Sequence, residues 1–164
     1  MTRTSHKETP EPFTIARAET AEDAAAVKAL FRAYAEWLNV DLCFQGFDEE
    51  MAGFPSTYDV LLLGKVNGEP GGAVGVKPFG AADARTCEMK RLYCLPQYQG
   101  IGLGRALAEA SLEAARRLGY RVMKLDTLTR LTAAAGLYRS MGFRETGAYY
   151  DNPLDDVLYM ERFL

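Results

Sequence analysis

Three glycines within five positions, Gly100, Gly102 and Gly104, constrain this chain more than any other feature of its sequence. Residues 87–95 favour an extended strand, and Pro96 ends it because proline has no backbone N–H to donate. After the glycines, apolar residues recur at spacings of three and four, as on one face of a helix. The stretch predicts a strand, a glycine-rich turn and an amphipathic helix with the apolar face Leu103, Leu107, Ala110, Ala114 and Leu118.

A turn of this kind is suited to bind an anion. The first amide N–H groups of a helix have no acceptor within the helix, and they lie at the positive end of its dipole. Glycine costs roughly 0.5–1 kcal/mol relative to alanine in a helix, so three glycines need an explanation. Close approach of a phosphate supplies one, and a tight turn without a ligand is the alternative.

Length and charge narrow the function classes. A chain of 164 residues with 48% apolar and 25% charged residues is typical of one soluble domain, predicted at residues 13–164 after a disordered tail at residues 1–12. The net charge of −3, without a concentrated basic face, argues against nucleic-acid binding. No apolar run approaches the roughly 18 residues of a membrane span, and the tail is too polar for a secretory signal. We therefore expect a cytoplasmic protein with neither nucleic acid nor membrane as partner.

The histidine and cysteine content excludes several kinds of catalytic and metal-binding site. The only histidine, His6, lies in the polar tail, which excludes a Ser-His-Asp triad and a histidine metal cage. Cys43, Cys87 and Cys94 are odd in number and lack the paired C-x-x-C spacing of zinc sites. We expect reduced packing thiols and predict no metal site.

The other elements follow from periodicity and turn residues. A first helix is predicted from Thr20, which with Asp23 resembles a capping pair, and a last helix, carrying Tyr138, ends at Gly142. Asn67-Gly68 favours an antiparallel hairpin, whereas the strands on either side of the glycine helix should be parallel. Further strands are predicted at residues 13–18, 60–66, 73–78, 121–127, 143–150 and 156–163.

The segment between residues 39 and 58 is aromatic but only weakly periodic, with a short helix expected near residues 48–52. Phe44, Phe47 and Phe54 are expected to cover the core beneath a long loop. A lid over a small-molecule site is the alternative, because loops of this length are uncommon within a domain.

Nucleotide-binding families also use glycine turns. Asp126, at a strand end about twenty residues after the glycines, fits the acid of Rossmann-like sheets that bind dinucleotides or S-adenosylmethionine. Those folds place the turn after their first strand and continue with several more strand–helix units, whereas only about 60 residues follow Gly104 here. A P-loop would require G-K-[ST] after the glycines, which is absent.

The stretch Gln99-Gly100-Ile101-Gly102-Leu103-Gly104 instead resembles the Q/R-x-x-G-x-G/A signature of the GNAT superfamily of N-acetyltransferases. Residues 137–143 resemble the family's L-Y-x-x-x-G-F segment, and Leu158-Tyr-Met-Glu resembles its last strand. The resemblance covers roughly residue 87 to the C-terminus and departs at Leu131, where many members carry asparagine. It implies an α/β (α+β) fold with a mixed, mostly antiparallel sheet of six or seven strands, a central parallel splayed pair and about four flanking helices.

The resemblance also implies a site. In the family, the cofactor arm enters the gap between the splayed strands, so the main chain of Leu92, Tyr93 and Cys94 would pair with acetyl-CoA, the cosubstrate. Glu88 stands where some members carry a carboxylate base, the alternative being a strand carboxylate paired with Lys90. The pyrophosphate would bind the amides of Gln99, Gly100, Ile101, Gly102, Leu103, Gly104 and Arg105.

Tyr138 would protonate the departing coenzyme A sulfur, the alternative being a core aromatic. The implied activity is acetyl transfer from acetyl-CoA to a primary amine by direct attack in a ternary complex. An acetyl-enzyme on Cys94 is disfavoured, because no cationic group is evident to lower the pKa of its thiol. The alternatives are a non-catalytic acyl-CoA sensor and a Rossmann-like nucleotide or S-adenosylmethionine binder.

The acceptor, a small-molecule or peptide amine, is not identified by the sequence. The oligomeric state also stays open, a homodimer included. The candidate walls of the acceptor site are Phe44, Gln45, Phe47, Tyr149, Tyr150 and Asp151.

Overall fold

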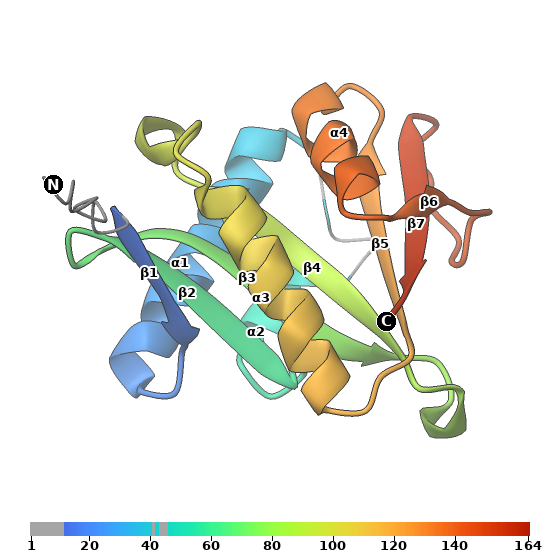
Figure 1. Cartoon of the computed structure of the whole chain (residues 1–164), viewed down its shortest axis with the longest axis horizontal. Helices are drawn as coiled ribbons and strands as arrows, with labels where there is room; N and C mark the ends of the chain where they lie inside the picture. Colours follow the sequence, from blue (N-terminus) through green and yellow to red (C-terminus); the bar gives the residue numbers. More distant parts are fainter. Residues whose placement is uncertain (1–11, 41, 43–45) are drawn as a thin grey trace, which may run out of the picture.

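The computed structural model describes residues 12–40, 42 and 46–164, which form a seven-stranded sheet with helices on both faces (Figure 1). The strand order is β1-β2-β3-β4-β5-β7-β6, and among these strands only β4 and β5 pair in parallel. The strands are β1 (Phe13–Arg17), β2 (Val60–Val66), β3 (Glu69–Phe79), β4 (Thr86–Cys94), β5 (Val122–Leu128), β6 (Arg144–Glu145) and β7 (Val157–Phe163). The described α-helices are α1 (Ala21–Leu38), α2 (Phe47–Ala52), α3 (Leu103–Arg117) and α4 (Thr132–Ser140).

This architecture confirms the expected mixed sheet with a central parallel pair. It also shows that the Rossmann-like alternative is wrong, because a doubly wound sheet is mostly parallel and this one is mostly antiparallel. The predicted tail lies outside the described residues, apart from Pro12.

Turn chemistry sets several of the connections as predicted. Thr20 caps α1, since its Oγ1 accepts the Asp23 N–H at 3.0 Å. Asn67 and Gly68 have φ angles of 51° and 83°, and these positive values give the tight hairpin between β2 and β3. Gly142, with φ 90°, follows the end of α4.

The strand predicted at residues 143–150 is wrong beyond its first residues. Only β6 pairs with β7, and the Thr146 N–H makes a further backbone bond to Tyr159. Tyr149 and Tyr150 then both turn toward the same face of the sheet, where they donate hydrogen bonds to carboxylates on β4 and β5. Consecutive side chains of a strand point to opposite faces, so this segment is a loop.

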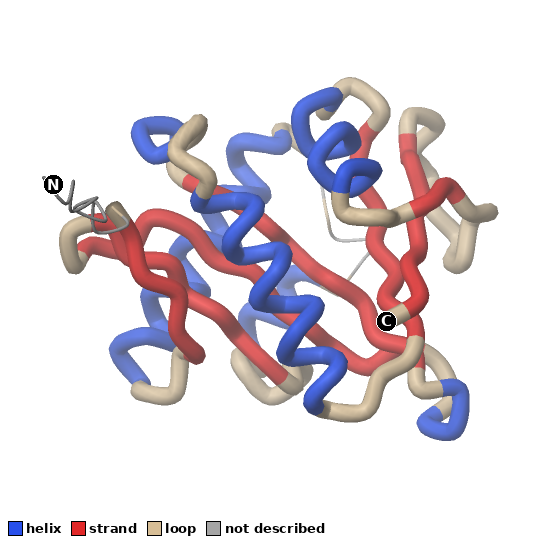
Figure 2. Tube along the Cα trace, in the orientation of Figure 1, coloured by secondary structure: helices blue, strands red, loops and turns tan. Residues whose placement is uncertain are grey.

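The two faces of the sheet carry separate apolar cores. In Figure 2, α3 crosses one face, with α4 beside it over β5 and β7, and α1 and α2 lie behind the sheet. Leu107 and Tyr138 belong to the core under α3 and α4, whereas Val27 and Phe31 belong to the core under α1. The apolar face predicted for α3 is wrong at Leu118, which is 47% exposed. The buried face of α3 is Leu103, Leu107, Ala108, Ser111, Leu112 and Ala115.

β4 and β5 separate along their length. Their register ends at Glu88 paired with Lys124, and beyond it the described residues of the two strands make no ladder pair. β4 also bulges, since Arg91 and Leu92 together oppose Val74 of β3, and Arg91 has the unusual φ of 61°. The buried Arg91 guanidinium is held by Glu50 of α2 at 2.9 and 3.3 Å. The bulge and this ion pair therefore fix β4 where it departs from β5.

The long segment after α1 contains α2 close to where it was expected. Phe47 and Phe54 are partly buried against the core under α1, so these two cover the core, while Phe44 lies outside the described residues.

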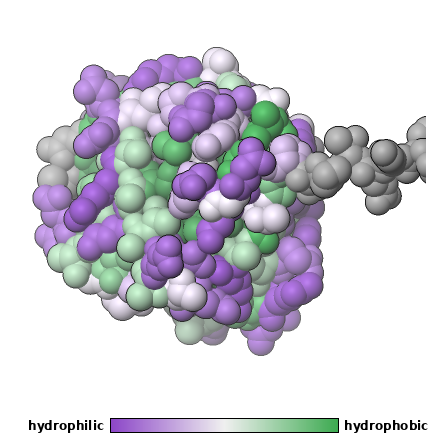
Figure 3. All heavy atoms as spheres, turned by 90° about the vertical axis from the view of Figure 1, so that its left-hand side faces the viewer, coloured by the Kyte–Doolittle hydropathy of each residue, from purple (hydrophilic) through white to green (hydrophobic). Residues whose placement is uncertain are grey.

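Around the edge strand β1, hydrophilic side chains are spread over the whole face between smaller apolar areas (Figure 3). Among the helices described, none combines the length and apolar character needed to cross a bilayer.

Candidate active site between strands β4 and β5

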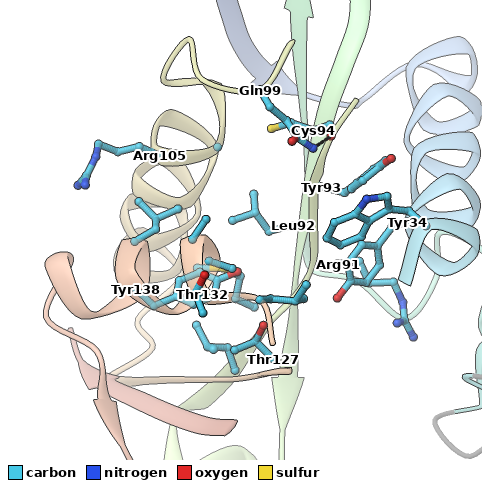
Figure 4. Close-up of a pocket in the computed structure, with 18 of the residues that line it drawn as sticks. Tyr34, Arg91, Leu92, Tyr93, Cys94, Gln99, Arg105, Thr127, Thr132 and Tyr138 are labelled. Atoms are coloured by element: carbon cyan, nitrogen blue, oxygen red, sulfur yellow. Dashed lines mark hydrogen bonds between the residues drawn. The ribbon is translucent and has the colours of Figure 1, made fainter. Parts of the chain in front are cut away.

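A cavity of about 520 Å³ opens where β4 and β5 separate. Figure 4 shows that side chains from β4, β5, α1 and α4 converge on it, and the start of α3 adds Gly104 and Arg105 to its lining. Nine of the residues singled out in the sequence line this cavity: Leu92, Tyr93, Cys94, Gln99, Gly100, Gly102, Gly104, Arg105 and Tyr138. Of the rest, Ile101 is 40% exposed, Leu103 is buried in the core, and Glu88 is not on the wall.

The glycine turn forms one end of the cavity and leaves amides unpaired. Gly100 and Gly102 have φ angles of 84° and 89°, which side-chain-bearing residues rarely adopt, and a Cβ at either would meet no atom within 4 Å. Ala106 is the first residue of α3 to bond backward, to the Gly102 carbonyl at 3.1 Å. The N–H groups of Leu103, Gly104 and Arg105 therefore have no acceptor within the helix. They form an anion cradle beside open space.

The edge of β4 supplies the next wall. Beyond Glu88, the described part of this edge has no β5 partner, so backbone donors and acceptors face the cavity. The Cys94 carbonyl is an exception, because it accepts a 3.2 Å hydrogen bond from the Gln99 side chain. An extended, amide-containing ligand can pair with such an edge as an added strand would.

Tyr138 closes the far side of the cavity. Its ring packs edge-on against Phe143 with centroids 5.9 Å apart, and the residue is 7% exposed. Figure 4 shows the side chain lying below Leu92, on the α4 side of the cavity. Burial, reinforced by the charges of Tyr34 and Asp126, raises the pKa of Tyr138 above its ordinary value. The hydroxyl therefore carries its proton at neutral and moderately alkaline pH.

Cys94 is a buried thiol in the same wall. Burial raises its pKa to about 11, so only about one thiol in ten thousand is ionised at pH 7. A nucleophilic cysteine needs the opposite shift. The environment thus agrees with a packing role for Cys94.

Glu88 sits behind the cavity rather than on its wall. The residue is 4% exposed and accepts a 2.7 Å hydrogen bond from the Tyr149 hydroxyl. Lys90 lies 3.7 Å away on the same strand face, which is the pairing considered as the alternative for this carboxylate. Contact between Glu88 and a substrate in the cavity would need an intervening group.

Arg105 points away from the cavity, and its exposed side chain donates to Ser140 of α4 at 2.8 Å (Figure 4). Arg105 is expected to bind the pyrophosphate through its backbone N–H, which does not depend on where the side chain points. Leu131, the departure from the family pattern, is the N-cap of α4 and makes no side-chain capping bond. Leu131 lines the cavity, so an apolar side chain stands where many family members carry asparagine.

Several wall residues were not singled out as site residues. Tyr34 and Trp37 of α1 approach Tyr93 at centroid distances of 5.7 Å each and form an aromatic cluster at the cavity. Asp126 was considered only as a nucleotide-binding acid, and it lies on the cavity wall. The position of Asp126 at a strand end was its only signal in the sequence. The aromatic cluster had no such signal, because Tyr34 and Trp37 lie more than 50 residues before Tyr93 in the chain.

The candidate acceptor walls divide into three groups. Tyr149 and Tyr150 bond the carboxylates of β4 and β5. Phe47 instead packs under the Arg91 guanidinium, with 4.9 Å from its ring centroid to Cζ. Asp151 is exposed, and neither it nor Tyr149, Tyr150 or Phe47 lines the cavity. Phe44 and Gln45 lie outside the described residues.

Comparison with known proteins agrees with this geometry. Residues 24–143 match the Acetyltransferase (GNAT) family. An uncharacterized N-acetyltransferase of Schizosaccharomyces pombe is 36% identical over 156 residues, covering 92% of this chain and 94% of that protein. A second uncharacterized N-acetyltransferase, from Dictyostelium discoideum, is 27% identical over 87% of this chain and 95% of its own length.

Solved structures show the same fold. A candidate acyl-CoA N-acyltransferase of Klebsiella pneumoniae superposes with a TM-score of 0.74 at 27% identity, covering 93% of this chain and 97% of its own. A candidate acetyltransferase of Salmonella typhimurium, solved with its cofactor acetyl-CoA, gives a TM-score of 0.68 at 26% identity, covering 93% and 94%. By sequence, fold and site, this chain belongs to the GNAT family of N-acetyltransferases.

Proposed function

We propose that this protein transfers the acetyl group of acetyl-CoA to a primary amine, by direct attack of the amine in a ternary complex. The observation that carries the proposal is the cavity itself. The unpaired amides of α3 lie at one end, the open edge of β4 runs along it, and Tyr138 lies at the other end. The Salmonella typhimurium neighbour, solved with acetyl-CoA, supports the choice of cosubstrate.

Acetyl-CoA fits the residues present. Its diphosphate requires hydrogen-bond donors and positive potential, which the amides at the start of α3 supply. Gly100 and Gly102 leave space for a bulky anion because no side chain occupies it. The amide groups of the pantetheine arm can pair with the β4 edge at Leu92 and Tyr93, and the acetyl group would then lie near Tyr138.

Acetyl transfer needs three proton movements. The neutral amine nitrogen attacks the thioester carbon, the C–S bond breaks, and the sulfur takes a proton from the Tyr138 hydroxyl. The ammonium proton of the acceptor passes to Glu88 through a water molecule, because Glu88 is behind the cavity wall. The second amine proton leaves with amide formation and restores the Tyr138 phenol, so one proton is released in total.

Burial affects both partners in the proton transfer to sulfur. It raises the pKa of Tyr138, which alone would weaken the phenol as a donor. It also raises the pKa of the Cys94 thiol in the same wall to about 11, and a coenzyme A thiolate leaving into this cavity experiences similar desolvation. The two pKa values therefore rise together, and the transfer stays close to balanced.

The proposed function is tested by two measurements. Acetyl-CoA consumption with a panel of primary amines should depend on enzyme and amine, and coenzyme A should raise the melting temperature. Ligand at 100 times its Kd adds roughly 2.7 kcal/mol of stability. Stabilisation by coenzyme A without turnover on any amine would identify an acyl-CoA sensor. Stabilisation by neither coenzyme A nor acetyl-CoA would contradict both functions.

Replacing Cys94 with serine is expected to leave kcat within about threefold of the unchanged enzyme. The thiol is protonated at neutral pH and direct attack does not use it. Steady-state kinetics, with mass spectrometry for a trapped acetyl-enzyme, is the measurement. Loss of turnover in a folded Cys94→Ser protein, or acetylation on Cys94, would show a covalent route instead.

Replacing Glu88 with glutamine is expected to lower kcat/KM for the amine by about tenfold to hundredfold and to change its pH profile, because the proton acceptor is lost. Glutamine can still accept the Tyr149 hydrogen bond, so the local structure is retained. Glu161→Gln, which removes a carboxylate paired with Lys124 on the neighbouring strands, is the matched control. If Glu88→Gln leaves kcat/KM and its pH profile unchanged, Glu88 is only a paired strand carboxylate.

The remaining expectations about this chain stay predictions. A location in the cytoplasm and a single domain over residues 13–164 are proposed from composition. An amine on a small molecule or a peptide, and a homodimeric state, are compatible with the site and are decided by the amine panel and by the molecular mass in solution.

A further inference from the structure

Asp126 lies at the fork, the point beyond the Glu88–Lys124 pair where β4 and β5 separate. The last ladder pair of the two strands is Glu88 with Lys124, and Asp126 follows two residues later on the same face of β5 as Lys124. It lines both the main cavity and a smaller hollow of about 40 Å³ on the α1 side of the sheet. The carboxylate is therefore shared by the two cavities.

A chain of hydrogen bonds orients the carboxylate. The Leu154 N–H donates to Asn152 Oδ1 at 2.9 Å, which fixes the orientation of the amide group. Asn152 Nδ2 donates to the Tyr150 hydroxyl at 2.9 Å, and that hydroxyl donates to Asp126 Oδ2 at 2.5 Å. Among the described residues, this is the hydrogen bond made by Asp126, and it engages Oδ2. Oδ1 is thus held in a defined direction at the fork.

Neighbouring charges are already paired, whereas Asp126 is not. The salt bridges of the described residues around the fork join Arg91 to Glu50, Lys90 to Glu88 and Lys124 to Glu161, and none includes Asp126. A partly buried carboxylate without a cationic partner is costly in an aromatic environment. A cationic ligand would offset that cost.

The field of Asp126 reaches side chains on every element around the fork. Burial is the first cause of the raised pKa values of four tyrosines, and the charge of Asp126 adds to it in each: Tyr34 of α1, Tyr138 of α4, Tyr149 of the loop and Tyr159 of β7. On β4, burial lowers the pKa of Lys90 and the charges of Glu88 and Asp126 oppose this shift. The charge of Asp126 therefore acts on groups on both sides of the sheet, including the proposed proton donor.

We propose that Asp126 anchors the ammonium group of the acceptor, and that the acceptor is an aliphatic primary amine that is protonated at neutral pH. This proposal rests on the proposed acetyltransferase function. Such amines have a pKa near that of lysine, about 10.4, so they arrive as cations. Arylamines and alcohols arrive neutral and gain nothing from the carboxylate. The rings of Tyr149, Tyr150 and Tyr159, 5.3 to 5.7 Å apart, form an aromatic cluster around the Tyr150–Asp126 hydrogen bond, in which the Tyr149 ring already carries the Lys124 ammonium.

Binding of a small probe tests the anchor without requiring turnover. Propylammonium chloride, titrated to tens of millimolar into the protein saturated with coenzyme A, should bind measurably by calorimetry, whereas propan-1-ol and aniline should not. Asp126→Asn should weaken propylammonium at least about tenfold, or about 1.4 kcal/mol. Tyr150→Phe keeps the charge but loses the orienting bond, so we expect a loss of a few fold. Asp155→Asn, which removes an exposed charge from the same loop, should have no effect.

Three results would overturn the anchor: no propylammonium binding to the unchanged protein, equal binding of the neutral probes, or equal weakening by Asp126→Asn and Asp155→Asn. Kinetics with n-propylamine adds a separate criterion. Asp126→Asn should raise KM for the amine and leave KM for acetyl-CoA unchanged. A variant that instead loses the pH dependence of kcat would make Asp126 a proton acceptor and contradict the anchor. If the unchanged protein binds propylammonium but never consumes acetyl-CoA, the proposed function fails while the cation site stands.

Discussion

A Gly104→Val variant is expected to bind coenzyme A about a hundredfold more weakly than the unchanged protein, a loss of about 2.7 kcal/mol. Gly104 lies in the first turn of α3 and on the cavity wall, and a Cβ there would lie 3.7 Å from Cys94 Sγ, an ordinary contact. The fold therefore accepts the side chain, but its methyl groups enter the space in front of the α3 amides. Calorimetric titration with coenzyme A measures the effect.

The control separates lost binding from lost structure. Gly136→Val makes the same replacement in α4, where a Cβ meets no atom within 4 Å, and should leave the affinity unchanged. Gly102 is a less suitable position, because its φ of 89° makes even alanine cost about 1–2 kcal/mol of stability. If Gly104→Val binds coenzyme A as tightly as Gly136→Val does, the amides at the start of α3 do not hold the diphosphate.

A Tyr138→Phe variant is expected to lower kcat by about a hundredfold to a thousandfold while KM for acetyl-CoA changes little. General acid catalysis typically contributes a factor of about 10² to 10⁴, and only the hydroxyl is removed. The raised pKa keeps the phenol protonated, so the unchanged enzyme should show no alkaline fall in kcat from Tyr138 across neutral and moderately alkaline pH. Steady-state kinetics over pH is the measurement.

The matched control is Tyr120→Phe, which removes a hydroxyl bonded to Asp59 just before β5, away from the cavity wall. It is expected to change stability without changing kcat. Thermal melting of both variants shows whether each remains folded. An unchanged kcat in folded Tyr138→Phe would leave Tyr138 as a buried core aromatic and nothing more.

Local patterns in the sequence were sufficient for much of the fold. The Thr20 cap, the Asn67-Gly68 hairpin and the glycine turn were predicted from spacing and backbone preference, and all are confirmed, because each depends on residues close in the chain. Tyr138 was assigned to the site by family resemblance, and it lines the cavity. The strand predicted at residues 143–150 was wrong because the local sequence could not reveal the carboxylates that bond Tyr149 and Tyr150.

The sequence alone determined the glycine-rich helix start, the order of the elements and the family, since these follow from short-range backbone chemistry and from motifs. Only the tertiary structure decided which carboxylate faces the cavity. Glu88 and Asp126 lie on adjacent strands, but the separation of β4 from β5 opens the sheet beside Asp126 and leaves Glu88 within the last ladder pair. Beyond that pair, β4 bulges at Arg91, and the Arg91 guanidinium is held by Glu50. These two residues are 41 positions apart in the chain, so no local pattern encodes their contact.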